Sequence, residues 1–206
     1  RLFEAFLDGD KMIPSGKRGA KGTLDKAGTE AARECSNARN RQNKSLDEAV
    51  FAAEAKIHKY DLLENRILFV RLDEDDTFPS ELNGLLAMKL SAKFKRPTIV
   101  ARLNKEGYNR GSMRGLNQSE LVSFKDFLTE SNMFEYVQGH DNAAGCSIPD
   151  SMLSKFHTWA NEALVDIDFG ENCYDVNFER IAADEDIKDL ILDIGAHNGI
   201  WGQQNG

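Results

Sequence analysis

Two short stretches of the sequence hold side chains suited to binding a phosphate. The first, GYNRGSMRG at residues 107–115, supplies one aromatic ring, one hydroxyl and two guanidinium groups from Tyr108, Ser112, Arg110 and Arg114. If this stretch is a strand, alternation places those four side chains on one face. An arginine fork matches phosphate oxygens, and an aromatic ring stacks on a base. The stretch predicts either a phosphate-binding strand, where Gly111 lets a phosphate come close, or a polar edge strand.

The second stretch, YVQGHDNAAGCSIPD at residues 136–150, is low in bulk and carries a single histidine. Gly139 suits a positive φ angle, which lets backbone N–H groups point at one spot. His140 could donate to a phosphate oxygen or to a developing negative charge, or it could be a structural hydrogen-bonding residue. Small residues bury little surface, so the pattern indicates that something approaches the backbone here.

A predicted strand–helix–strand unit precedes both stretches. The apolar run at residues 66–72 and the run at 97–103 read as buried strands, and residues 80–94 between them have helical periodicity. This order is typical of a parallel βαβ unit. Gly84 weakens the predicted helix, which indicates close approach of another backbone or a ligand.

Further helices are predicted from their starting residues. Ser45 and Glu48 form a capping box, Ser119 caps another helix, and Pro149 occupies the first turn of a third. The two phosphate-binding stretches add further strands. The expected fold class is therefore α/β, with a mixed β-sheet flanked by helices and an N-terminal helical linker segment.

Charge is unevenly distributed along the 206 residues, although the net charge is −8. Residues 89–114 hold eight basic residues and one acidic residue, and residues 11–44 hold nine and three. Residues 162–193 instead hold eleven acidic and two basic residues. Such a polarised field is compatible with a nucleic-acid partner, whereas the net charge alone would argue against one. No apolar run of about 18 residues is present, so no membrane span is expected.

The cysteine and acidic residues do not predict a disulfide or a metal site. Cys35, Cys146 and Cys173 are odd in number and form no C-x-x-C pair, which favours a reducing cytoplasm. The acidic stretches at 73–76, 166–168 and 184–186 are interpreted as solvated loops. The first residues contain neither an initiator methionine nor a signal-peptide pattern, so we interpret the chain as a piece of a longer one.

RGSMRG followed by QGHDNAAGCSI resembles the C-terminal, DHH-associated domain of the DHH phosphoesterase superfamily. The pattern is most similar to RecJ-type single-stranded-DNA 5′ exonucleases, with further likeness at residues 37–42, 82–101 and 193–205. Three positions depart from the family pattern: Gln138 replaces the first glycine of the turn, Gly115 replaces a serine, and Asp141 stands where proline is common.

The resemblance implies specific roles for the residues of both stretches. Arg114 and His140 would be catalytic residues at the scissile phosphate. Substrate phosphates would be bound by Arg110, Gly111, Ser112 and Gly139. The family's Mn²⁺ or Mg²⁺ is held by a separate DHH domain, and this sequence contains no Asp-His-His stretch. The chain is therefore not expected to hydrolyse DNA alone and needs no cofactor of its own.

The expected organisation has three parts. Residues 1–60 form a helical linker from a preceding DHH domain, residues 61–165 the substrate-binding domain, and residues 166–206 an extension towards a further domain. The expected function is to bind single-stranded DNA for a metal-dependent 5′ exonuclease of DNA repair or recombination, with the DHH domain of the same chain as partner. The alternatives are a phosphodiesterase of short oligonucleotides or cyclic dinucleotides, and a non-catalytic nucleic-acid-binding module.

Overall fold

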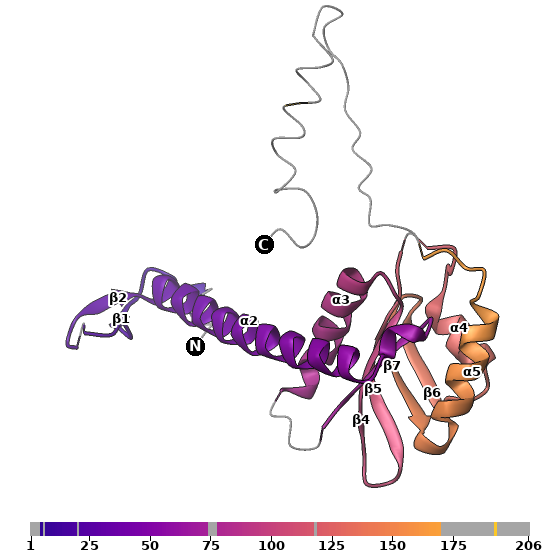
Figure 1. The fold of residues 1–206 in the computed structure, drawn as a ribbon. Helices are drawn as coiled ribbons and strands as arrows, with labels where there is room; N and C mark the ends of the chain where they lie inside the picture. Colours follow the sequence, from indigo (N-terminus) through magenta and orange to yellow (C-terminus); the bar gives the residue numbers. More distant parts are fainter. Residues whose placement is uncertain are drawn as a thin grey trace, which may run out of the picture.

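A five-stranded sheet with helices on both faces forms the body of the protein, and a long helix extends from it (Figure 1). The structure is a computed structural model that describes residues 5, 7–19, 21–73, 78–117, 119–169 and 192. The predicted α/β class with a mixed sheet is confirmed. Almost all of the expected C-terminal extension lies outside the described residues.

The sheet contains the strands that the sequence predicted. They are β3 (Leu68–Leu72), β4 (Thr98–Leu103), β5 (Tyr108–Arg114), β6 (Tyr136–His140) and β7 (Ala143–Pro149). Their order is β3-β4-β5-β7-β6, with β3 and β4 parallel and every other neighbouring pair antiparallel. The predicted parallel βαβ unit is thus confirmed, and the two phosphate-binding stretches form β5 and the antiparallel β6–β7 pair.

Each face of the sheet packs against its own helices. The shorter helices are α3 (Asn83–Phe94), α4 (Phe124–Glu130) and α5 (Leu153–Ala163), with 3₁₀ turns η1 (Leu62–Glu64), η2 (Ser80–Leu82) and η3 (Asp150–Met152). On the α3 face, Val70 and Val100 bury their side chains against Leu86 and Leu90. On the opposite face, the core includes Ile99, Met113, Phe124, Ile148 and Phe156. Burial of each such side chain stabilises the fold by about 1.5–3 kcal/mol.

The long helix α2 (Ala27–Lys59) lies within the expected helical linker of residues 1–60, but it begins well before Ser45, the residue predicted to cap it. Ser45 lies in the middle of α2 instead of capping it, because the residues before it include arginine, glutamine and lysine, which are strong helix formers. Leu46, Ala53 and Ile57 are buried against the body, whereas the first half of α2 is largely exposed. At about 1.5 Å per residue, α2 is about 50 Å long.

A small hairpin stands at the start of α2. It pairs β1 (Met12–Pro14) with β2 (Leu24–Lys26) in antiparallel register, so β1 lies in a stretch that composition alone suggests is a loop. Within the described residues, no helix has both the length and the apolar content required to cross a membrane.

The helix predicted from Ser119 begins four residues later. Ser123 is the N-cap of α4, and its hydroxyl accepts a hydrogen bond from the Asp126 N–H at 3.1 Å. The Ser119 hydroxyl instead lies 3.0 Å from the Leu116 carbonyl oxygen and 3.2 Å from that of Leu121, and its single hydrogen can be donated to either. Two serines in one short stretch both satisfy the capping preference, and the packing of Phe124 selects the second.

Candidate nucleic-acid interface

Strand β5 directs its basic side chains to the face of the sheet that carries α3. Asn109 and Met113 are fully buried on the opposite face, as the alternation of a strand requires. The α3 face therefore receives Tyr108, Arg110, Ser112 and Arg114. The sequence predicted this grouping, and α3 covers only the part of the face next to β4 and β5 (Figure 1).

Arg114 and His140 lie on one row across three strands. The register pairs Arg114 with Ala143 of β7, and Ala143 with His140 of β6. Residues paired in this way point to the same side of a sheet, and two strand spacings separate their Cα atoms by about 10 Å. A depression of about 490 Å³ is lined by both residues, together with Met88, Ser91, Gly115, Asn117, Val122, Asp141, Asn142 and Ala143. The structure thus brings the two predicted catalytic residues together.

Small residues of β7 form the floor between β5 and β6. Ala143, Gly145 and Ser147 point to the α3 face, while Ala144, Cys146 and Ile148 are buried on the other face. A Cβ atom at Gly145 would have no protein atom nearer than the Gly111 carbonyl oxygen at 3.8 Å. The protein itself therefore does not require the lack of bulk at Gly145, and the surface above it is open.

Arg114 is half-buried and has no carboxylate partner among the described residues. Its Nη1 donates to the Met113 carbonyl at 2.7 Å, and its guanidinium lies against the backbone of Gly84 in the first turn of α3. Burial lowers the pKa of the Arg114 guanidinium from its ordinary value, because the charged form loses hydration. The charge stays uncompensated, since the side chain remains protonated at neutral pH.

Arg110, at the other end of the same face, has a different environment. Its Nη2 lies 3.4 Å from a Glu106 oxygen and 3.7 Å from a Glu135 oxygen. Its guanidinium also lies 5.9 Å from the centre of the Tyr108 ring. The two carboxylates partly offset the positive charge at Arg110, so a stronger attraction for an anion is expected at Arg114, which has no carboxylate partner among the described residues.

The predicted phosphate-binding residues Ser112, Gly111 and Gly139 occupy different settings. Ser112 is half-buried, aligned with Gly145 across the strand pair, and its hydroxyl has no hydrogen-bond partner in the described part of the chain. Gly139 has the expected positive φ, 142°. Gly111 is explained by packing: a Cβ there would overlap the Val100 carbonyl oxygen of β4. A Cβ at Gly139 would likewise overlap the Ala143 carbonyl oxygen and Ala144, so packing accounts for both glycines, and their contact with a phosphate stays a prediction.

The β6–β7 turn is held by Asn142, which the sequence interpretation did not single out. The Asn142 carbonyl accepts from the Gly115 N–H at 3.0 Å, and its side-chain oxygen accepts from the Phe124 N–H at 3.3 Å. A Cβ at position 115 would overlap that oxygen, so Gly115 accommodates Asn142. An asparagine in a two-residue turn was the available signal.

Gln138, the other departure near the turn, projects onto the same face. It is exposed and pairs with Gly145 of β7, one row away from His140. Its amide therefore borders the open floor opposite Ser112.

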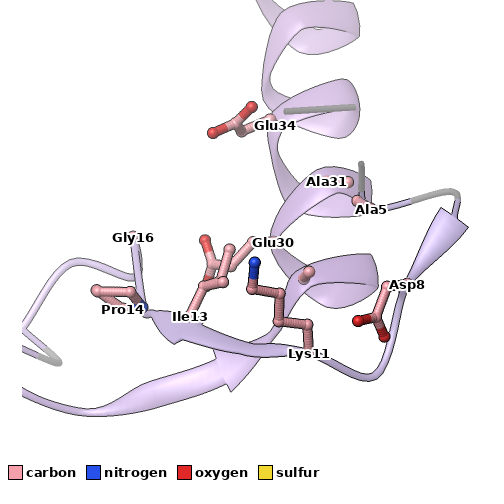
Figure 2. Close-up of a pocket in the computed structure, with 10 residues that line it drawn as sticks. Ala5, Asp8, Lys11, Ile13, Pro14, Gly16, Glu30, Ala31 and Glu34 are labelled. Carbon is pink, nitrogen blue, oxygen red and sulfur yellow. The ribbon is translucent and has the colours of Figure 1, made fainter. Parts of the chain in front are cut away.

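The depression at Arg114 has Asp141 in its lining, ion-paired with Lys125 at 3.5 Å, whereas a second cavity has three carboxylates. This cavity, of about 290 Å³, lies between the hairpin and the start of α2, with Asp8, Glu30 and Glu34 in its lining (Figure 2). Glu30 is buried and ion-paired with Arg33. Carboxylates repel phosphate, so this cavity is unsuited to a nucleic acid.

No group of three or more histidine, cysteine, aspartate or glutamate side chains in the described residues is placed to hold a metal ion. Of the acidic stretch at 73–76, only Asp73 is described, and it is ion-paired with Lys56 at 2.6 Å. The stretch at 184–186 lies outside the described residues.

Two curated proteins are similar to the chain over nearly its whole length. One is named as the SPbeta prophage-derived single-strand DNA-specific exonuclease YorK of Bacillus subtilis (strain 168), and the other as the same exonuclease of Bacillus phage SPbeta. Each is 30% identical over 206 aligned residues, which cover 98% of this chain. The chain spans only 35% of the length of these relatives. No family profile matches the chain.

Solved structures of RecJ show a more distant likeness. The Mn²⁺ complex from Thermus thermophilus matches with a TM-score of 0.48 and 15% identity, over 68% of this chain and 20% of that one. A second RecJ structure, bound to manganese, matches with a TM-score of 0.46 and 14% identity, over 68% and 33% of the two chains.

Proposed function

We propose that this chain, a domain of the RecJ type of DHH-family exonucleases, binds the single-stranded DNA substrate. A single DNA strand would lie on the open β5–β7–β6 face, with a phosphate in the depression at Arg114 and His140. The observation that carries the proposal is the row that joins an uncompensated Arg114 to His140 across the small Ala143.

The chemistry of the depression favours a phosphate over a neutral ligand. A half-buried guanidinium without a carboxylate interacts strongly with an anion, because partial desolvation weakens screening. His140 adds a donor on the far side of the row, and Ser112 adds a hydroxyl one row away. Met88 and Val122 supply apolar surface at the rim, which suits a sugar or the face of a base.

The catalytic metal is proposed to reside in a DHH domain elsewhere in the longer protein. When bound, Mn²⁺ or Mg²⁺ would activate a water molecule for attack on the phosphodiester. Arg114 and His140 would stabilise the charge that develops on the phosphate oxygens, while Ser112 and Gly139 would orient the strand. Binding by this chain alone is expected to be weak, and hydrolysis by it alone is not expected.

The arrangement of α2 supports the proposed domain organisation. A helix that is exposed over much of its first half is typical of a connector between folded units. Residues 1–60 would then connect the DHH domain to the substrate-binding domain of residues 61–165. The proposed compartment is the cytoplasm, which agrees with the free thiols of Cys35 and Cys146.

A matched pair of arginine variants tests the proposal in the intact protein. Arg114→Gln removes the uncompensated charge and is expected to reduce single-strand exonuclease activity at least tenfold, which corresponds to about 1.4 kcal/mol. Arg110→Gln removes an equal charge from the same strand and face, but one already offset by Glu106 and Glu135, so a smaller loss is expected. Wild-type activity in Arg114→Gln would refute the role.

Two further measurements separate the alternative functions. A series of substrate lengths distinguishes a long-strand exonuclease from a phosphodiesterase of short oligonucleotides or cyclic dinucleotides. A non-catalytic module would bind single strands tightly as this chain alone, with a salt dependence that reports the phosphates contacted. Relatives named as single-strand DNA-specific exonucleases favour the first function.

A further inference from the structure

Gly84 faces the guanidinium of Arg114 from the first turn of α3. A Cβ atom at position 84 would overlap Arg114 Nη2 and would lie 3.1 Å from Cζ and 3.5 Å from Nη1. Gly84 is buried, and glycine is the least favourable helix residue after proline. The helix therefore accepts a local cost in stability at a position that meets this guanidinium.

The first turn of α3 is anchored to the sheet independently of Arg114. Arg102 of β4 donates from Nη1 to the buried Asn83 side chain at 3.3 Å, and its Nη2 donates to the Phe78 carbonyl. These bonds fix the residue before Gly84 relative to β4. The recess at Gly84 is consequently a fixed feature of the α3–sheet contact, into which the flexible end of the Arg114 side chain fits.

We infer that Gly84 is a positioning residue, whose missing side chain provides the recess that holds the Arg114 guanidinium for binding a DNA phosphate. The inference rests on the proposed function. The recess restricts a side chain that would otherwise have many rotamers, so less conformational freedom is lost when the phosphate binds. It does so without a carboxylate, which would compete with the phosphate.

The substitution Gly84→Ala distinguishes a role of Gly84 in positioning Arg114 from a role in folding. The atoms it would meet belong to the end of a flexible side chain, so Gly84→Ala is expected to displace the guanidinium while the backbone stays in place. In contrast, Gln at position 114 is too short to reach the recess. Arg114→Gln therefore provides a background in which the substitution at position 84 meets no guanidinium.

The test is a double-mutant cycle in the intact protein, with affinity for a single-stranded oligothymidine measured in EDTA to prevent cleavage. Gly84→Ala is expected to weaken binding about threefold or more, within the range for contacting side chains. It is expected to cause no further loss in the Arg114→Gln background. In the Arg114→Gln background, Gly84→Ala is also expected to raise Tm by about 2 °C or more, because alanine is a better helix former than glycine.

Each contrary result has a separate meaning. If Arg114→Gln leaves binding unchanged, the proposed function and this inference both fail. If Arg114→Gln weakens binding but Gly84→Ala does not, only the inference fails. Equal losses from Gly84→Ala in both backgrounds would show an effect that does not pass through Arg114. A Gly84→Ala protein that does not fold would show that the recess serves the packing of α3, which also overturns the inference.

Discussion

Replacing Gly145 by valine tests whether the open floor of the sheet face is the binding surface. The φ angle of Gly145 lies outside the left-handed region, and a Cβ there would meet only two carbonyl oxygens, at 3.8 and 4.0 Å. Both are ordinary van der Waals distances. The Gly145→Val chain is therefore expected to fold with the same register.

The expected stability change is an increase. Glycine inside a strand costs about 0.5–1 kcal/mol relative to a residue with a side chain, and valine is among the residues most enriched in strands. For a domain of this size, about 1 kcal/mol corresponds to a rise in Tm of about 2–4 °C. Differential scanning calorimetry of the intact protein measures this change.

The expected change in DNA binding has the opposite sign. The valine side chain would occupy the space above β7, where the sugar–phosphate backbone is proposed to lie. Overfilling a packed contact costs about 1–3 kcal/mol, which corresponds to a loss of affinity of about fivefold to more than a hundredfold. Fluorescence anisotropy with a 3′-labelled oligothymidine in EDTA measures the affinity.

A control variant on the opposite side of the sheet shows whether a loss of DNA affinity comes from filling the floor or only from adding an apolar side chain to the surface. Thr158 is exposed on α5, and Thr158→Val adds a valine there without affecting the floor. This control is expected to bind DNA with wild-type affinity. A folded Gly145→Val protein with wild-type affinity would refute the reasoning that small residues on β7 make room for the strand.

Three other outcomes follow from the structure. Gly111→Ala is expected to lower the free energy of unfolding by about 3 kcal/mol or more, because its Cβ would overlap a backbone carbonyl. Urea unfolding measures this change. Asn142→Ala removes hydrogen bonds that hold the β6–β7 turn. It is expected to lower the free energy of unfolding by about 1–3 kcal/mol and to weaken DNA binding. Unchanged binding would show that the turn does not position His140. Iodoacetamide at pH 8 is expected to label the exposed Cys35 and not Cys146, because burial raises the pKa of the Cys146 thiol to about 12; peptide mass spectrometry measures the labelling.

The strands and their faces were predictable because strand alternation is a local property. The apolar runs of β3 and β4, the four-residue face of β5 and the positive φ of Gly139 all follow from residue types within a few positions. Gly84 was also informative, since a glycine in an otherwise regular helix indicated a close contact. The sequence could not show that the contact is with Arg114, 30 positions later.

The structure differs from the sequence-based expectation where a local motif fits two positions, or where contacts with distant residues decide the structure. Ser45 satisfied the capping box, but nothing in that motif records that the preceding residues already form a helix. Ser119 and Ser123 were equivalent candidates until Phe124 was seen to enter the core. A tertiary cause also acts at Gly111, where the backbone of the neighbouring strand explains the glycine and the predicted phosphate contact stays a prediction.

Because α2 is a continuous helix, its length fixes both the distance between its two ends and the angle by which one end is rotated relative to the other about the helix axis. Each residue of an α-helix turns the chain by about 100° and advances it by about 1.5 Å. One residue inserted into the exposed first half of α2 would rotate the hairpin by over a quarter turn about the helix axis. Seven inserted residues would instead add about 10 Å and restore the facing to within about 20°, so the angular relation of the two ends depends on the number of residues in the helix.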